Sequence, residues 1–143
     1  FKALTNMPNS QDLKEAGLKI TLPRLRILAV LENCNQRHFT AEDVYKSLLE
    51  AGEDIAFATV YRVLTQFENA GLVLRHNFEG GRSVFELDDG EHHDHMVCVK
   101  CNNVTEFYDA EIEVRQKAAA EKHNFELQDH SLYLYGLCGN CTK

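Results

Sequence analysis

The segment richest in reactive side chains is "GEHHDHMVCVKC", residues 90–101, which combines histidines, carboxylates and cysteines within twelve positions. These are the side chains that bind transition metals in proteins. If the segment is extended, successive side chains point to opposite faces. His93 and His95 then lie on one face, and His92 and Asp94 lie on the other. The segment therefore predicts two separate metal sites.

The cysteines predict a third site. Cys98 and Cys101 form one CxxC pair, and Cys138 and Cys141 form a second. Two such turns supply four thiolates to a tetrahedral zinc ion, with zinc–sulfur distances of about 2.3 Å. Since the protein fills all four positions, we expect a structural zinc; a four-cysteine iron centre for electron transfer is the alternative. Cys34 lies outside these pairs, in the apolar pattern "ILAVLENC", and we expect it to be buried.

The two histidine faces need further ligands from elsewhere in the chain. Mixed imidazole and carboxylate ligands suit Fe(II), Mn(II), Co(II) or Zn(II), and geometry chooses among these metals. His76 and His123 have no metal-binding neighbours in sequence, so we expect them to be structural or surface residues. The candidate ligands are His38, Glu86, Glu106, Glu111, Glu113 and His130.

Helical patterns dominate the first half of the chain. The segment "DLKEAG" predicts a short helix that ends at Gly17. Thr21 is a predicted cap for the next helix, with Pro23 in its first turn. Thr40, three residues before Asp43, predicts a capping box at the start of "TAEDVYKSLLEAG". The apolar residues of the second helix include Leu25, Leu28, Ala29 and Leu31.

The fourth predicted helix, "FATVYRVLTQFENAG", has one apolar and one polar face. Its apolar positions recur at i, i+3, i+4 and i+7, and two strands, 72–78 and 82–87, follow it around "EGG". This order of elements predicts a winged helix-turn-helix whose last helix enters the DNA major groove. Arg62 could then contact guanine edges or phosphates, Tyr61 thymine methyls, and Thr59 bases or backbone. A solvated helix face is the alternative. The apolar positions are Val60, Val63, Leu64 and Phe67.

The second half predicts a small α/β domain after a hinge at residues 88–91. Residues 95–99 and 104–108 are predicted strands, residues 110–124 a helix, and residues 125–138 a returning strand. The returning strand could pair with its copy across a two-fold axis, which predicts a homodimer. We therefore expect an α+β protein with a winged helix-turn-helix domain at 1–87 and a metal-binding dimerisation domain at 92–143.

Charge and composition limit the classes of partner. A net charge of -7 argues against non-specific binding of nucleic acid by the whole surface. Residues 14–26 nevertheless carry four basic side chains against one acidic, a local +3. No apolar run approaches the roughly 20 residues that span a bilayer, so we expect no membrane partner. The start of the chain lacks a signal-peptide pattern, and we expect a cytoplasmic protein whose natural start is Met7, with residues 1–6 added.

Taken together, these motifs closely resemble the ferric uptake regulator (Fur) family. The shared segments are "GLKITLPR", "ATVYRVL", "GGRSVFEL" and "HHDH", followed by the two CxxC pairs, and the resemblance runs from about Leu13 to Cys141. It implies a dimeric, metal-dependent transcriptional repressor that binds double-stranded DNA at an AT-rich palindromic operator. It leaves open whether dimers pair into tetramers.

The resemblance also implies which residues form each site. The DNA contacts would be Tyr61 and Arg62 in the major groove and Lys19 in a narrow, negative minor groove. Structural Zn²⁺ would be held by the four cysteines of the CxxC pairs. An interdomain regulatory metal would be bound by His38, Glu86, His93, His95 and Glu106. A second regulatory site would consist of His92, Asp94, Glu113 and His130.

The match is closest to the iron-sensing branch, which implies Fe²⁺ as the regulatory metal, replaceable in vitro by Mn²⁺, Co²⁺ or Zn²⁺. Zinc-sensing and peroxide-sensing members share the same motifs and are the alternatives within the family. From another class, a metallohydrolase would need an open coordination position and a substrate cleft, and no catalytic nucleophile is evident. A metal-storage module is disfavoured by the predicted recognition helix. We therefore expect a regulator rather than an enzyme.

Overall fold

Residues 10–34 and 36–142 are described in a computed structural model of the chain. The chain divides into two compact units, of which the first ends at Asp89 and the second begins at Gly90. The expected start at Met7 and the expected addition at residues 1–6 lie outside the described residues. Among the helices that the structure describes, none has both the length and the apolar character needed to cross a bilayer.

The first unit begins with helices whose ends follow from local sequence. Thr21 caps α3 by accepting a hydrogen bond from the Arg24 amide at 3.4 Å. The predicted capping box of α4 is formed, because Thr40 Oγ1 accepts from the Asp43 amide at 3.1 Å and Asp43 Oδ2 from the Thr40 amide at 2.9 Å. The helices are α2 (Ser10–Glu15), α3 (Leu22–Asn33), α4 (Ala41–Glu50) and α5 (Phe57–Asn69).

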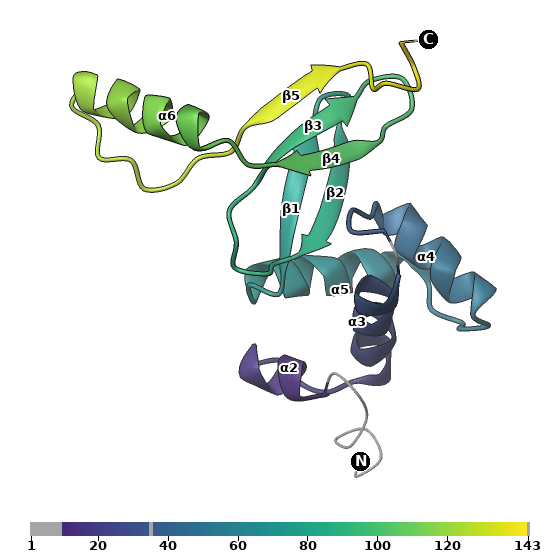
Figure 1. The fold of residues 1–143 in the computed structure, drawn as a ribbon. Helices are drawn as coiled ribbons and strands as arrows, with labels where there is room; N and C mark the ends of the chain where they lie inside the picture. The colour runs from purple at the N-terminus through teal and green to yellow at the C-terminus, as the bar shows by residue number, and fades with distance from the viewer. Residues whose placement is uncertain (1–9, 35, 143) are drawn as a thin grey trace. The chain divides into compact units, whose positions relative to one another are not determined.

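The core of the first unit lies where α3, α4 and α5 pack against one another (Figure 1). All four predicted apolar residues of α5 are buried. On α3, Leu25, Ile27, Leu28 and Leu31 are buried, and Ala29 is half-buried. One expectation at its end was wrong. Cys34 is exposed rather than buried, because α3 ends at Asn33 and the cysteine follows the last helical turn.

The predicted wing is an antiparallel hairpin of β1 (Val73–Phe78) and β2 (Arg82–Leu87). Gly80 and Gly81 form the turn with φ angles of 90° and 78°, a region that favours glycine. Phe39, between α3 and α4, forms an isolated bridge with Phe85 of β2. The bridge places the residue before Phe39 beside the end of β2.

The second unit is a three-stranded sheet with one helix. Its elements are β3 (Asp94–Cys98), β4 (Val104–Phe107), α6 (Ala110–Lys122) and β5 (Tyr133–Gly136). The strand order is β4-β3-β5, with β4 antiparallel and β5 parallel to β3. The predicted strand over 125–138 was too long: only Tyr133–Gly136 is a strand, and residues 125–132 form an irregular connection from α6.

Helix α6 extends away from the sheet of its own unit (Figure 1). Asp109 caps it by accepting hydrogen bonds from the amides of Glu111 and Ile112. None of its residues is buried, and apolar side chains on it and after it, such as Val114 and Phe125, are exposed. This apolar surface is therefore available to a partner.

Candidate metal centres and nucleic-acid interface

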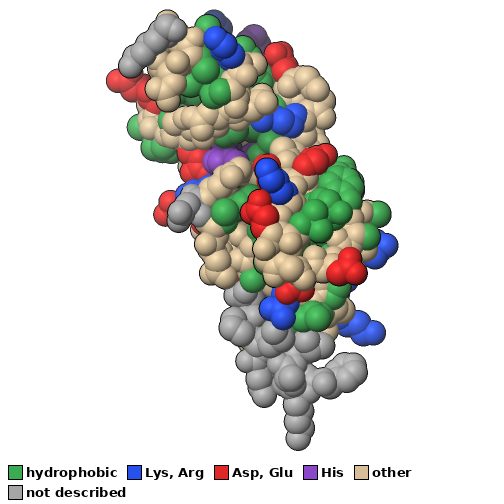
Figure 2. Space-filling model, turned by 90° about the vertical axis from the view of Figure 1, so that its right-hand side faces the viewer, with side chains coloured by type: hydrophobic (Ala, Val, Ile, Leu, Met, Phe, Trp, Pro, Cys, Tyr) green, Lys and Arg blue, Asp and Glu red, His purple; other side chains and the backbone are tan. Residues whose placement is uncertain are grey.

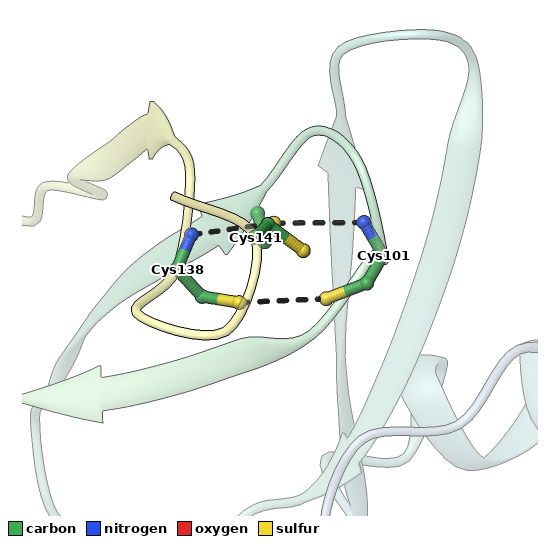
Figure 3. Close-up of side chains that lie close together, drawn as sticks. Cys101, Cys138 and Cys141 are labelled. Atoms are coloured by element: carbon green, nitrogen blue, oxygen red, sulfur yellow. Dashed lines mark hydrogen bonds between the residues drawn. The ribbon is translucent and has the colours of Figure 1, made fainter. Parts of the chain in front are cut away.

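The four cysteines of the CxxC pairs come together at one end of the sheet. Parallel pairing of β3 with β5 sets Cys98 opposite Gly136, so the two CxxC turns follow neighbouring strand ends. The thiols of Cys101 and Cys138 point toward one another with their sulfurs 3.7 Å apart (Figure 3). A tetrahedral zinc with 2.3 Å bonds requires sulfur–sulfur distances of about 3.8 Å. The cluster fits that geometry, because all four sulfurs lie within 4.8 Å of one another.

The environment of these thiols favours ionisation at one position and opposes it at another. Cys98 Sγ accepts hydrogen bonds from the backbone amides of Cys101 at 3.5 Å and Cys138 at 3.4 Å. These bonds lower the pKa of Cys98 to about 6. The neighbouring Cys138 thiol, followed by burial, raises the pKa of Cys141 to about 12. Four thiolates so close together repel one another, and a divalent cation would offset that repulsion.

A second cluster within this unit joins one face of the histidine segment to α6. The Nε2 atom of His92 lies 3.2 Å from Asp94 Oδ1 and 3.2 Å from Glu113 Oε1. His130, from the connection before β5, places its Nε2 3.3 Å from the same Glu113 oxygen. Ligand atoms of all four residues lie within 4.8 Å of one another.

The carboxylate of Asp94 shows that this cluster suits a cation. Asp94 is wholly buried, and neither of its oxygens accepts a hydrogen bond from any described residue, although the His92 ring nitrogen lies 3.2 Å from Oδ1. A buried carboxylate without donors costs several kcal/mol unless a positive charge compensates it. A divalent ion held by this carboxylate, a second one and two imidazoles would supply that charge.

The opposite face of the histidine segment meets β4. His93 Nε2 lies 3.3 Å from Glu106 Oε1, and the rings of His93 and His95 are 5.0 Å apart. His95 is buried and stands opposite Glu106 in the antiparallel ladder. The predicted alternation is therefore confirmed within this unit: His93 and His95 share one group, and His92 and Asp94 share the other. Glu111, another candidate ligand, is exposed on α6 and belongs to neither group.

In the first unit, two histidines contact the buried carboxylate of Glu86. The Phe39–Phe85 bridge brings His38 alongside, with its Nε2 3.2 Å from Glu86 Oε2. The other oxygen, Oε1, lies 2.5 Å from His76 Nε2. Glu86 is wholly buried on β2.

The pairing of His76 with Glu86 escaped sequence reasoning. In the hairpin, His76 pairs with Val84, two positions from Glu86, so the two side chains are diagonal neighbours on one face. A register drawn from the "EGG" turn would have shown this. His123 is exposed at the end of α6, as expected of a surface residue.

The candidate DNA-contacting residues lie on exposed parts of the first unit. Tyr61 and Arg62 are exposed on α5, and Thr59 is half-buried near its start. Lys19 is exposed before α3, and its carbonyl accepts a hydrogen bond from Arg24 Nη1 at 2.8 Å. Positive and negative side chains are interspersed on the face drawn in Figure 2. Attraction to DNA would therefore depend on local groups rather than on the whole surface.

A winged helix followed by a unit rich in imidazole, carboxylate and thiol ligands defines a class of protein, the metal-responsive transcription regulators. The family model for the ferric uptake regulator family matches residues 15–135. The chain belongs to the ferric uptake regulator family.

Individual relatives are similar over nearly their whole length. The ferric uptake regulation protein of Legionella pneumophila is 64% identical over 135 residues, which cover 94% of this chain and 99% of that protein. The crystal structure of the Vibrio cholerae ferric uptake regulator has a TM-score of 0.85 and 59% identity, covering 91% of this chain and 99% of that one. The ferric uptake regulator of Francisella tularensis with iron also has a TM-score of 0.85, at 42% identity, covering 89% and 96%.

These similarities confirm the resemblance, the fold class and the class of function. The protein is a metal-dependent, DNA-binding transcriptional regulator of a dimeric family, with an N-terminal DNA-binding and a C-terminal dimerisation domain. They favour a regulator over the metallohydrolase and metal-storage alternatives.

Proposed function

We propose that the protein is an iron-responsive repressor in which Fe(II) joins the DNA-binding domain to the dimerisation domain. The observation that carries this proposal is that each domain holds a group of imidazole and carboxylate ligands that is incomplete by itself. The first domain contributes His38 and the buried Glu86, which lie 3.2 Å apart. The second contributes Glu106 with the two histidines of its group, His93 and His95.

When bound, the divalent cation supplies a link between ligands of both domains. His38 and Glu86 would then hold the DNA-binding domain in one orientation across the hinge at 88–91. In a dimer this orientation determines the separation of the two α5 helices. DNA would select the linked state, and linkage requires that DNA tighten metal binding by the same factor.

Iron is proposed over zinc because of the ligand types. Two carboxylates, Glu86 and Glu106, add hard oxygen ligands that suit Fe(II), although Mn(II), Co(II) or Zn(II) would be accepted in vitro. The relatives named for ferric uptake and the Francisella protein with iron support the same choice. A zinc sensor and a peroxide sensor that oxidises its histidine ligands are the alternatives.

The other two clusters have separate proposed roles. The Cys98, Cys101, Cys138 and Cys141 cluster would hold a structural Zn²⁺ that fastens the end of β3 to the end of the chain. The His92, Asp94, Glu113 and His130 cluster would bind a second regulatory cation that fastens α6 and the 125–132 connection to β3.

The proposed homodimer would form through the second domain. β5 is an edge strand of the sheet, and antiparallel pairing with its copy would satisfy the backbone groups of that edge. The exposed apolar side chains of α6 and its flanks would be covered in the same step. These side chains include Val114, Phe125, Leu134 and Leu137. Dimers could then pair further into tetramers on DNA.

The proposed operator is an AT-rich palindromic duplex. A two-fold symmetric protein binds two symmetric half-sites, with α5 of each copy in the major groove. Tyr61 and Arg62 would contact base edges, and Thr59 would contact a base or the backbone. Lys19 would enter the adjacent minor groove, which is narrow and strongly negative at AT-rich sequence. Repression from such operators would take place in the cytoplasm.

The test is anaerobic binding to such a duplex in buffered Fe(II), buffered Zn(II) or chelator. Binding at cell-like free Fe(II), lost with chelator and not restored at the much lower free zinc of a cell, is the expected result. Binding restored at that low concentration of free zinc would identify the protein as a zinc sensor of the family. Binding indifferent to metal would overturn the proposed link between the domains.

A further inference from the structure

The side chain of Arg75, on β1, is enclosed by side chains of α5. Its Nη2 donates a hydrogen bond to Thr65 Oγ1 at 2.8 Å, and its Nη1 donates to Tyr61 Oη at 3.3 Å. The third nitrogen, Nε, forms an ion pair with Glu68 Oε1 at 3.1 Å. Every nitrogen of the guanidinium is therefore engaged by a residue of α5.

Two aromatic rings complete the enclosure. The guanidinium carbon of Arg75 lies 4.8 Å from the ring centroid of Phe85 and 5.4 Å from that of Tyr61. Tyr61 in turn meets Phe85 edge-on, with centroids 6.5 Å apart and ring planes at 89°. A guanidinium at these distances is attracted to both ring faces. Only 17% of the Arg75 side chain is exposed, whereas Tyr61 is 41% exposed.

These contacts separate Arg75 from an ordinary DNA-binding arginine. A phosphate-binding guanidinium presents its N–H groups to solvent, whereas each nitrogen of Arg75 contacts a side chain of α5 and little of the Arg75 side chain is exposed. Tyr61 is the member of the cluster that projects outward. Its hydroxyl oxygen accepts from Arg75, so its hydrogen can be donated elsewhere.

We infer that Arg75 is a positioning residue that holds Tyr61 in the orientation that contacts thymine in the major groove. The inference rests on the proposed DNA-binding role of α5. A tyrosine free to change rotamer must be ordered when DNA binds, whereas one fixed beforehand has already lost that freedom. Arg75 thereby acts on sequence selection without touching DNA.

The experiment compares thymine with deoxyuridine, which lacks the C5-methyl group. Mn(II)-loaded protein is titrated with an AT-rich palindromic duplex and with duplexes in which single half-site thymines are replaced. For the unmodified protein, each contacted methyl should contribute roughly fourfold in affinity. Arg75→Gln should bind the thymine duplex about two- to tenfold more weakly and should lose the preference for thymine.

Two further variants separate positioning from charge. Arg75→Lys keeps the charge but lacks the planar fork of donors, so it cannot stack flat on the rings or reach Thr65, Tyr61 and Glu68 in the same geometry. It should therefore behave like Arg75→Gln. Lys46 is exposed on α4, outside the cluster around Arg75. Lys46→Gln removes one positive charge and should keep the full thymine preference. The slope of affinity against salt should be unchanged in both Arg75 variants, since no phosphate contact is lost.

Two results would overturn the inference while leaving the proposed function intact. One is a normal thymine preference in Arg75→Gln. The other is recovery in Arg75→Lys together with a salt slope lowered by about one in Arg75→Gln, which indicates a phosphate contact. A complete lack of thymine preference in the unmodified protein would overturn the role of Tyr61, and the inference with it.

A second variant tests the inference in case Arg75→Gln does not fold. If Arg75→Gln does not fold, Thr65→Val removes the nearest acceptor of the guanidinium with little change in shape. It should reduce the thymine preference by the same mechanism, and an unchanged preference would count against positioning. In the background Tyr61→Ala, Arg75→Gln should cause no further loss, because there is no ring left to position.

Discussion

The two domains are held together by different means. The first has a continuous apolar core in which Val60, Leu64 and Phe67 of α5 pack against α3 and α4. In the second, the buried hydrophobic residues among those described are only Val97 and Cys98, while Asp94 and His95 are buried and polar. One domain is stabilised by apolar packing, whereas the other buries few apolar residues and includes buried polar groups.

The two kinds of domain are suited to different parts of a metal sensor. A domain with a full core folds whether or not metal is present, so metal can change its orientation without changing its fold. A domain with a sparse core gains folding free energy directly from ligation. Substitutions in the two domains should therefore have different effects on folding, on the dimer and on DNA binding.

The largest effect is expected from Cys98→Ser. Ligation of structural zinc provides roughly 10–16 kcal/mol in small zinc-binding peptides, and one lost thiolate weakens it severely. The second domain should lose its folded structure and the protein its dimer, while the first domain keeps its protection from hydrogen exchange. Hydrogen exchange resolved by residue would measure the folding of each domain, and sedimentation would measure the dimer.

Cys34→Ser is the matched control, because it removes an exposed thiol from the end of α3. It should leave zinc content and the dimer unchanged. A Cys98→Ser protein that is dimeric and normally stable would break the contrast between the domains.

The corresponding change in the first domain is Phe67→Ala. Phe67 is wholly buried, and truncation of a buried phenylalanine costs about 3–5 kcal/mol through lost burial and a cavity. Amides of the first domain should exchange faster and DNA binding should weaken, whereas dimer and zinc content persist. Leu49→Ala, half-exposed on α4, should cost less than about 0.5 kcal/mol. Loss of the dimer in Phe67→Ala would show that the two domains do not fold independently.

Sequence patterns predicted the first domain better than the second, for a physical reason. The period of α5 and the Thr40 capping box are local signals, and both are present in the structure. The pairing of His76 with Glu86 follows from the hairpin register rather than from the pattern of either strand alone. The enclosure of Arg75 depends on tertiary packing of β1 against α5, which no local pattern encodes.

In the second domain, the alternation of the histidine segment was predictable because a strand has a fixed period of two. The extent of β5 was not. Residues 125–132 contain the same mixture of apolar and polar residues as a strand, yet they form a connection that carries His130 to Glu113. A side chain can therefore be brought to a cluster by an irregular connection as well as by a strand.

A smaller effect on folding, with a large effect on function, is expected from His95→Ala. His95 belongs to the proposed interdomain site, so the variant should stay folded and dimeric but lose metal-dependent DNA binding. Regulatory metal affinity should fall by more than the 10- to 100-fold that loss of an outer partner typically costs. His123→Ala, exposed in the same domain, is the control. Unchanged metal-dependent binding in His95→Ala would remove it from the site.

The smallest effect is expected from Glu32→Gln, which tests whether this charge affects the stability of the first domain. Burial, followed by the nearby charge of Asp12, raises the pKa of Glu32. A carboxyl whose pKa is higher in the folded state than in the unfolded state loses stability as pH rises through that window. Glutamine carries no charge to repel Asp12, so at neutral pH the variant should be more stable by a few tenths of a kcal/mol, given the exposure of the site. The gain should vanish below about pH 4.5, where the unmodified carboxyl is protonated in both states.

Denaturant unfolding of the first domain across this range of pH would measure the gain, with Glu50→Gln, at an exposed position of α4, as the control. An equal gain at all pH values would indicate a cause other than this charge.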